Sequence, residues 1–417
     1  MFKKTVLKNG IRLITAPLKE TQTVSLLVLV KVGSRYETST IGGMSHFVEH
    51  MMFKGTKRRP NTLALSKELD GIGAEYNAFT GKDVTGYYIK ADASHAPLAV
   101  DMLSDMLTSS KLDEAELNKE KGVIAEEINM YEDNPIMYVE GMLEEIMFGG
   151  NPLGRQIAGE RETVKAVTRQ KMLAYKNKHY TGKNIVIALA GNFDDKIVKL
   201  LDKPFNFASG KVNHFSKIKI SQKQSRLKLK FKDTEQVQVA LGLPAYPYSS
   251  PKIYPLQLLS VILGGNMSSR LFINVRERKG LAYFVRSWAN VYEDTGSLTI
   301  QAGLDKNRID LALETIIAEL KKINKGVSTA ELQRAKDFIA GKTALDLEES
   351  MAIAQFYGSQ EIMTGKIMTP AQKLAKIKAV TRADIARTAK EVINLKRLNL
   401  AVIGPFKDEK RFIDLIK

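Results

Sequence analysis

The sequence of 417 residues contains no cysteine, so disulfide bonds and thiolate metal sites are excluded. It also lacks a long apolar run, because the most apolar stretch, Val24 to Val32, is far too short to span a bilayer. The first twenty residues show no long apolar segment and no cleavage site of small residues, so we expect no signal peptide. These absences predict a cytoplasmic protein without membrane association.

Charge is plentiful and unbalanced, with a formal net charge of +17. The lysines are mostly interspersed with acidic residues on helix-like segments, and only the stretch 203–232 is basic without any acidic residue. Net charge bears on solubility before it bears on function, so we attribute it to a solvated surface and expect no nucleic-acid partner. The alternative, nucleic-acid binding, predicts a steep dependence of binding on salt.

Two pairs of similar segments indicate an internal repeat. "EAELNKEKGVIAEE" (114–127) resembles "TAELQRAKDFIAGK" (329–342). "KAVTRQKM" and "KAVTRADI", which begin at Lys165 and Lys378, are followed at the same spacing by the strand-like segments "NIVIALAGNF" and "RLNLAVIGPF". We therefore expect an N-terminal domain at 1–207, a linker at 208–226 and a homologous C-terminal domain at 227–417.

Each half combines strand-like alternation with long amphipathic helices, and the helices come in groups. This arrangement predicts the α+β class, as a tandem duplication of a domain with a largely antiparallel sheet flanked by helices. The two copies differ in their polar residues, because Glu120 and Glu127 align with Ala335 and Lys342. A cluster of polar groups kept in one copy alone points to a function rather than to a shared structural role.

The segment "GGMSHFVEHMMFKGT" (42–56) holds two of the five histidines. On a helix, His46 and His50 lie one turn apart on one face, with Glu49 at its edge. Two imidazoles at this spacing can chelate one ion, and zinc favours imidazole nitrogen together with carboxylate oxygen. A zinc site would need a third protein ligand and an open position for water.

Candidates for that ligand lie in "LNKEKGVIAEEINMYED" (117–133). Glu120 and Glu127 are two helical turns apart and share a face, whereas Glu126 points about a third of a turn away. Val123 and Ile124 are expected on the neighbouring buried side. One or both of Glu120 and Glu127 should then point toward the interior, where an unpaired carboxylate is costly.

The order His-x-x-Glu-His marks the inverzincins. Together with "GAEYNAFTGKDVTGYY" and "EKGVIAEEINMYEDNP", in this order and spacing, it resembles the pitrilysin-type metallopeptidases. That family includes insulin-degrading enzyme and the mitochondrial processing peptidase. The resemblance covers nearly the whole chain and is strongest over 42–159 and 270–303.

The resemblance implies one Zn²⁺ per chain, held by His46, His50 and Glu127, with Glu126 as the competing third ligand. It further implies that Glu49 is the general base and that Glu120 orients a ligand histidine. In the second half, Arg276 and Tyr283 match a pair that holds the substrate beside the zinc.

Four residues near the zinc motif match substrate-binding positions of the family. Asn77, Ala78 and Phe79 match an edge strand to which the substrate adds as a further strand. Phe53 and Phe79 match residues that line the pocket for the side chain after the cleaved bond. That pocket should favour apolar or aromatic side chains.

These matches predict a zinc metalloendopeptidase that cleaves unstructured peptides between two homologous domains arranged as a clamshell. The expected state is a homodimer, with a monomer or a heterodimer with an inactive paralogue as alternatives. The alternative function is a non-catalytic structural subunit of a related complex. Zinc content of the purified protein distinguishes the two functions.

Overall fold

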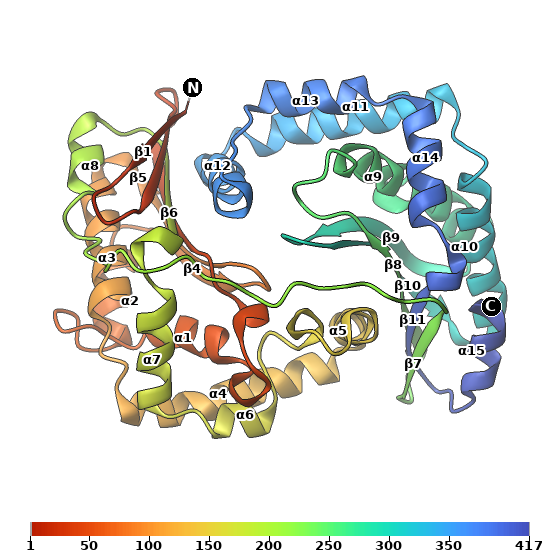
Figure 1. Cartoon of the computed structure of the whole chain (residues 1–417), viewed down its shortest axis with the longest axis horizontal. Helices are drawn as coiled ribbons and strands as arrows, with labels where there is room; N and C mark the ends of the chain where they lie inside the picture. The colour runs from red at the N-terminus through yellow and green to blue at the C-terminus, as the bar shows by residue number, and fades with distance from the viewer. Residues whose placement is uncertain (1, 417) are drawn as a thin grey trace. The chain divides into compact units, whose positions relative to one another are not determined.

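The computed structural model describes residues 2–416, which form two compact units (Figure 1). The first comprises the residues up to 128, together with 156–216 and 344–368, and the second comprises 129–155, 217–343 and the residues from 369 onward. Neither unit is contiguous in sequence. Among residues 2–416, no helix combines the length and apolar character needed to cross a membrane.

The first unit is built on a six-stranded sheet with the order β1-β2-β6-β3-β5-β4. β2 and β6 run parallel, and every other neighbouring pair is antiparallel. Its strands are β1 (Lys3–Val6), β2 (Arg12–Pro17), β3 (Thr23–Val30), β4 (Glu75–Thr80), β5 (Thr85–Asp92) and β6 (Ile185–Gly191). β3 and β6 are buried along almost their whole length, so helices must cover both faces of this sheet.

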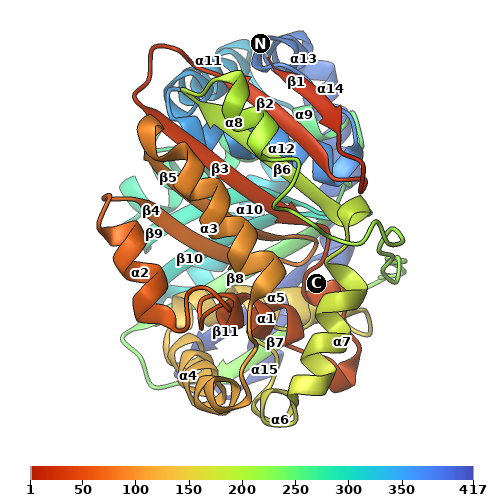
Figure 2. The ribbon, with the colours of Figure 1, turned by 90° about the vertical axis from the view of Figure 1, so that its left-hand side faces the viewer.

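Helices pack on both faces. The first face carries α1 (Met44–Met52), α2 (Thr62–Asp70), α3 (Ala96–Ser109), α4 (Glu114–Asp133), α6 (Arg161–Lys165), α7 (Arg169–His179) and α8 (Asp195–Leu200) around the main core. Figure 2 shows α3 lying across β3 and β5. The opposite face is covered by α12 (Ser350–Thr364), a helix from the C-terminal part of the chain.

The second unit repeats this topology in a five-stranded sheet with the order β7-β11-β8-β10-β9. Its strands are β7 (Arg226–Phe231), β8 (Gln236–Ala245), β9 (Ala282–Val291), β10 (Gly296–Asp305) and β11 (Asn399–Gly404). β7 and β11 run parallel, as β2 and β6 do, and the remaining pairs are antiparallel. The expected α+β fold and its duplication are confirmed, since β2, β6, β3, β5 and β4 correspond to β7, β11, β8, β10 and β9.

The helices of the second unit include one from the N-terminal half of the chain. They are α5 (Pro135–Phe148), α9 (Ile253–Ser260), α10 (Ile309–Ile323), α11 (Thr329–Asp346), α13 (Pro370–Ala379), α14 (Arg382–Val392) and α15 (Glu409–Ile416). α5 packs on β8 and β11, and it does so closely because β8 has Gly242 beneath Leu143 and Met147. Each half of the repeat therefore lends one helix to the sheet of the other half.

The expected linker, 208–226, is without regular structure up to β7, and its middle part is held by a hydrogen bond within each unit. Asn213 donates from its backbone N–H to Oδ1 of Asn184, at 2.7 Å, within the first unit. Ile218 donates from its backbone N–H to Oδ2 of Asp294, at 2.8 Å, within the second unit. The boundary between the units falls between residues 216 and 217, and the domain limits at 207 and 227 stay a prediction.

Candidate metal centre

α1, which carries the histidine motif, is held in place at its N-terminus. Gly43 has a φ of +89°, and a Cβ there would lie 2.4 Å from the carbonyl oxygen of Ala158, so only glycine fits. The buried carboxylate of Glu37 accepts hydrogen bonds from the backbone N–H groups of Gly43 and Ser45, at 2.7 and 2.6 Å. This carboxylate satisfies donors that would otherwise be left unpaired at the start of the helix.

α4 presents one buried side, formed by Leu117, Glu120, Ile124 and Ile128. Glu127 is half-buried beside this stripe, whereas Glu126 is exposed. Val123, which was expected on the buried side next to Ile124, is 51% exposed. That expectation was wrong because the buried side of the helix is centred on Glu120 and Ile124 and excludes Val123.

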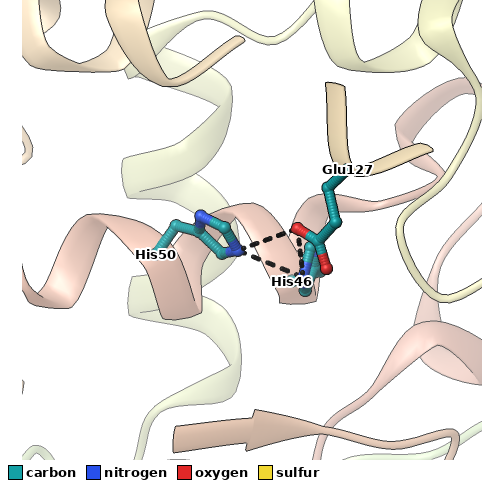
Figure 3. Close-up of side chains that lie close together, drawn as sticks. All are labelled: His46, His50 and Glu127. Carbon is teal, nitrogen blue, oxygen red and sulfur yellow. Dashed lines mark hydrogen bonds and ion pairs between the residues drawn. The ribbon is translucent and has the colours of Figure 1, made fainter. Parts of the chain in front are cut away.

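His46, His50 and Glu127 converge, as Figure 3 shows. The Nε2 atoms of the two histidines are 3.2 Å apart, and Oε2 of Glu127 lies 3.5 Å from the first and 3.4 Å from the second. Zinc bonds of about 2.0–2.1 Å in a tetrahedron place neighbouring ligand atoms about 3.3–3.4 Å apart. Within residues 2–416, this is the one group of three or more histidine and acidic side chains with metal-site spacing, and it fits a zinc ion.

Glu120 contacts His50 on the side of the ring away from Glu127. Its Oε1 accepts a hydrogen bond from Nδ1 of His50 at 2.8 Å, which directs Nε2 of that ring toward Glu127. Its Oε2 lies 2.6 Å from the ammonium group of Lys54. Burial raises the pKa of Glu120, but the bonds with His50 and Lys54 outweigh it and hold that pKa below its usual value.

The charges of the cluster are coupled. Burial lowers the pKa of His50, but its bonds with Glu120 and Glu127 outweigh this effect and raise the pKa to about 9. The same histidines hold the pKa of Glu127 far below its usual value. Glu127 is therefore a carboxylate throughout the physiological range, as a metal ligand must be.

Glu49 is on the same helix as the two histidines and is half-buried. Its Oε2 accepts a hydrogen bond from the hydroxyl of Thr80, at the end of β4. Burial raises the pKa of Glu49, and the Thr80 hydroxyl and both histidines only partly oppose this rise. A carboxylate with a raised pKa next to a metal site can accept a proton and release it again.

Sequence reasoning did not find Lys54 or Thr80. Lys54 follows His50 by four residues and lies just beyond the end of α1 at Met52, so this spacing was a usable signal. Thr80 lies thirty-one residues from Glu49, and only the packing of β4 against α1 brings the two together. No local pattern could have identified it.

The predicted substrate-binding residues lie on and near β4. This strand is at the edge of the first sheet, so within the described residues 2–416 one side of its backbone has no strand partner. Asn77 is exposed, and its side-chain oxygen accepts a hydrogen bond from the N–H of Ala78 at 2.8 Å. Phe79 is 37% exposed, while Phe53 and Ala78 are partly buried against the core.

Arg276 and Tyr283 both belong to the second unit. The guanidinium carbon of Arg276 lies 4.8 Å from the centre of the Phe272 ring, within a π-helical turn at Phe272–Glu277. Tyr283 interrupts the register of β9, because Phe284 pairs with Gly303 whereas Ala282 pairs with Leu304. Such a bulge turns a side chain away from the regular sheet, and Tyr283 is 72% exposed.

Comparisons with known proteins agree with this organisation. The family described as "Insulinase (Peptidase family M16)" matches residues 12–161, and "Peptidase M16 inactive domain" matches residues 166–338. A protein of Bacillus subtilis called an uncharacterized zinc protease is 36% identical, over 97% of this chain and 98% of its own length.

Two solved structures share the fold. A protease from Helicobacter pylori has a TM-score of 0.91 at 23% identity, and the match covers 97% of this chain and 99% of that one. A chain of complex III from Candida albicans has a TM-score of 0.83 at 20% identity, over 99% of both chains.

Proposed function

Because the chain belongs to the insulinase family of peptidases, family M16, we propose that it is a zinc-dependent endopeptidase that cleaves unstructured peptides. The observation that carries this proposal is the convergence of His46, His50 and Glu127 at zinc spacing, next to the carboxylate of Glu49. The B. subtilis relative is itself called a zinc protease.

In this proposal His46, His50 and Glu127 hold the zinc, one ion per chain. When bound, zinc lowers the pKa of a coordinated water and polarises the carbonyl of the bond to be cleaved. Glu120 keeps the His50 ring oriented through the 2.8 Å bond to Nδ1, and Lys54 keeps Glu120 in place.

Glu49 is the general base. It removes the proton from the attacking water and later delivers it to the amine that leaves. Two observations support this role: burial raises the pKa of its carboxyl, and the hydroxyl of Thr80 fixes one of its oxygens.

The substrate adds to β4 as a further strand, through the backbone of Asn77 and Ala78. The position of β4 at the edge of its sheet supports this mode of binding. Phe53 and Phe79 then line the pocket for the side chain after the cleaved bond, which should be apolar or aromatic.

We expect the second unit to act on the same substrate. Tyr283 donates a hydrogen bond to the developing oxyanion, and Arg276 holds a carbonyl of the substrate. The bulge that exposes Tyr283 supports a role outside the sheet. We expect the active species to be a homodimer.

A non-catalytic subunit is the second candidate, favoured by the fold shared with a chain of complex III. That likeness, at 20% identity, concerns the fold alone. The complete set of His46, Glu49, His50 and Glu127 favours the peptidase, since a purely structural subunit has no use for these residues.

The proposal is tested by digesting a mixed peptide library and identifying the products by mass spectrometry, with and without a chelator. We expect cleavage that the chelator abolishes. Glu49→Gln should keep about one zinc per chain, yet its turnover should fall about 10²–10⁴-fold, the usual contribution of general-base assistance. Near-normal turnover in this variant would rule out Glu49 as the base.

A further inference from the structure

An arginine on β9, the edge strand of the second sheet, lies between two aromatic rings. The guanidinium carbon of Arg286 is 4.9 Å from the centre of the Trp288 ring and 5.9 Å from that of Phe284. The three residues alternate along the strand, so they share one face of the sheet. Stacking on aromatic faces attracts the cation and limits the directions in which it can point.

Neutral side chains complete the support of this arginine. Nε and Nη2 of Arg286 both donate to Oε1 of Gln301, at 3.1 and 2.6 Å. Gln301 is fully buried, and its own amide donates to the carbonyl of Ile136. The indole N–H of Trp288 donates to Oδ1 of Asn290 at 2.9 Å. Each part of the arrangement is thereby fixed in orientation.

The side chain of Arg286 is exposed to solvent. Its guanidinium has no carboxylate partner among residues 2–416 and bonds only to the neutral Gln301. Other arginines of the same unit are paired: Arg270 lies 2.6 Å from Glu331, and Arg411 lies 2.7 Å from Asp310. Gln301 occupies the Nε side of the guanidinium. The end formed by Nη1 and the second hydrogen of Nη2 is therefore left for a ligand.

We propose that Arg286 is a subsite for a carboxylate of the peptide substrate, either an acidic side chain or the C-terminal carboxylate. A guanidinium whose end is open binds a carboxylate through two parallel hydrogen bonds, and prior orientation reduces the entropy lost on binding. This inference rests on the proposed peptidase function, and it adds a preference for acidic peptides to it.

Arg286 and Tyr283, the proposed oxyanion donor, are on the same strand, β9. Arg286 follows Tyr283 by three residues, which corresponds to about 10 Å along an extended strand. An extended peptide advances by the same amount per residue. A peptide lying extended along β9 would place its bound carboxylate about three residues from the group that Tyr283 contacts.

The test uses the full-length, zinc-loaded Glu49→Gln variant, in which the expected loss of turnover lets peptide binding be measured with little cleavage. Trp288 is the single tryptophan of the chain, so its fluorescence reports on this subsite directly. Three ten-residue peptides are titrated: one with an internal glutamate and an amidated C-terminus, its glutamine counterpart, and that counterpart with a free C-terminal carboxylate.

We expect at least one of the two carboxylate peptides to bind about tenfold or more tightly than the neutral one, because a hydrogen bond to a charged group contributes about 1.5–3 kcal/mol. The peptide that shows the preference identifies the source of the carboxylate. Adding Arg286→Gln should abolish the preference. Arg286→Lys should keep part of it, because lysine retains the positive charge but cannot form the two parallel hydrogen bonds of a guanidinium.

Arg278→Gln is the matched control, since Arg278 is also exposed in this unit and bonds to a neutral amide, that of Asn274, at 3.1 Å. It should leave the preference intact. Equal affinity for all three peptides, or a preference that survives Arg286→Gln, would overturn the inference. If the wild-type chain cleaves the neutral peptide in that case, the proposed peptidase function still stands, so the two failures are distinguishable.

Discussion

Glu127 and Glu126 are neighbours in the sequence but differ in their surroundings. Oε2 of Glu127 lies within 3.5 Å of both histidine Nε2 atoms, whereas Glu126 is exposed on α4. We expect Glu127→Gln to lose zinc and Glu126→Gln to retain about one ion per chain. Elemental analysis after dialysis measures both variants under the same conditions. The reverse result would mean that α4 is rotated by one residue about its axis.

At the same scale, helical spacing predicted which residues share a helix face, whereas their assignment to one zinc site came from the family resemblance. His46 and His50 are one turn apart, and Glu120 and Glu127 are two turns apart, so the periodicity of each helix was sufficient to group them. The hydrogen bond from Thr80 to Glu49 depends on how β4 packs against α1, and periodicity carries no information about that packing. The substrate-binding residues Asn77 and Phe79 stay a prediction based on family resemblance.

At the scale of elements, the packing of α12 on the first sheet can be tested by a substitution. Gly358 faces the sheet, and a Cβ there would lie 3.0 Å from Cδ1 of Leu29 and 3.3 Å from Cβ of Ala188. Gly358→Val should lower the free energy of unfolding by about 1–3 kcal/mol, the usual cost of overpacking a core. The gain in helix propensity, a few tenths of a kcal/mol, is smaller.

The matched control is Gly341→Ala on α11, where an added Cβ meets no atom within 4 Å. Alanine restricts the unfolded chain more than glycine does, so this change should raise the free energy of unfolding by about 0.5–1 kcal/mol. Urea unfolding followed by circular dichroism measures both variants. A Gly358→Val protein as stable as the wild type would show that α12 is not packed on β3 and β6 as closely as the structure has it.

The repeat predicted which elements correspond, but not which sheet each helix covers. The aligned segments 114–127 and 329–342 both form helices, α4 and α11, as expected. The next helix in each half, α5 or α12, then packs on the sheet of the other half. An apolar helix face shows that the helix must be buried, and it does not show against which of two similar sheets.

This exchange decides how the whole molecule can be divided. A fragment ending at residue 207 lacks α12, which would expose Ile14, Leu27 and Leu29 of the first sheet. Burial of each such side chain is worth about 1.5–3 kcal/mol, so the loss of about 5–9 kcal/mol rivals the whole stability of a typical domain. We expect the fragment to be unfolded or insoluble by circular dichroism, and to fold when it is co-expressed with residues 208–417. A folded fragment on its own would contradict this expectation.

The action of both units on one substrate is tested through Tyr283, which lies more than two hundred residues from the histidine motif. If the units act independently, a change there leaves catalysis untouched. If Tyr283 donates to the oxyanion, Tyr283→Phe removes one hydrogen bond that matters only in the transition state. We then expect unchanged zinc content and unfolding temperature, but a fall in kcat/KM of about 10²–10³-fold, the effect of deleting one oxyanion donor. Arg276→Ala should also raise KM, because substrate positioning is lost. Wild-type kinetics in Tyr283→Phe would confine catalysis to the unit that carries His46, His50 and Glu127.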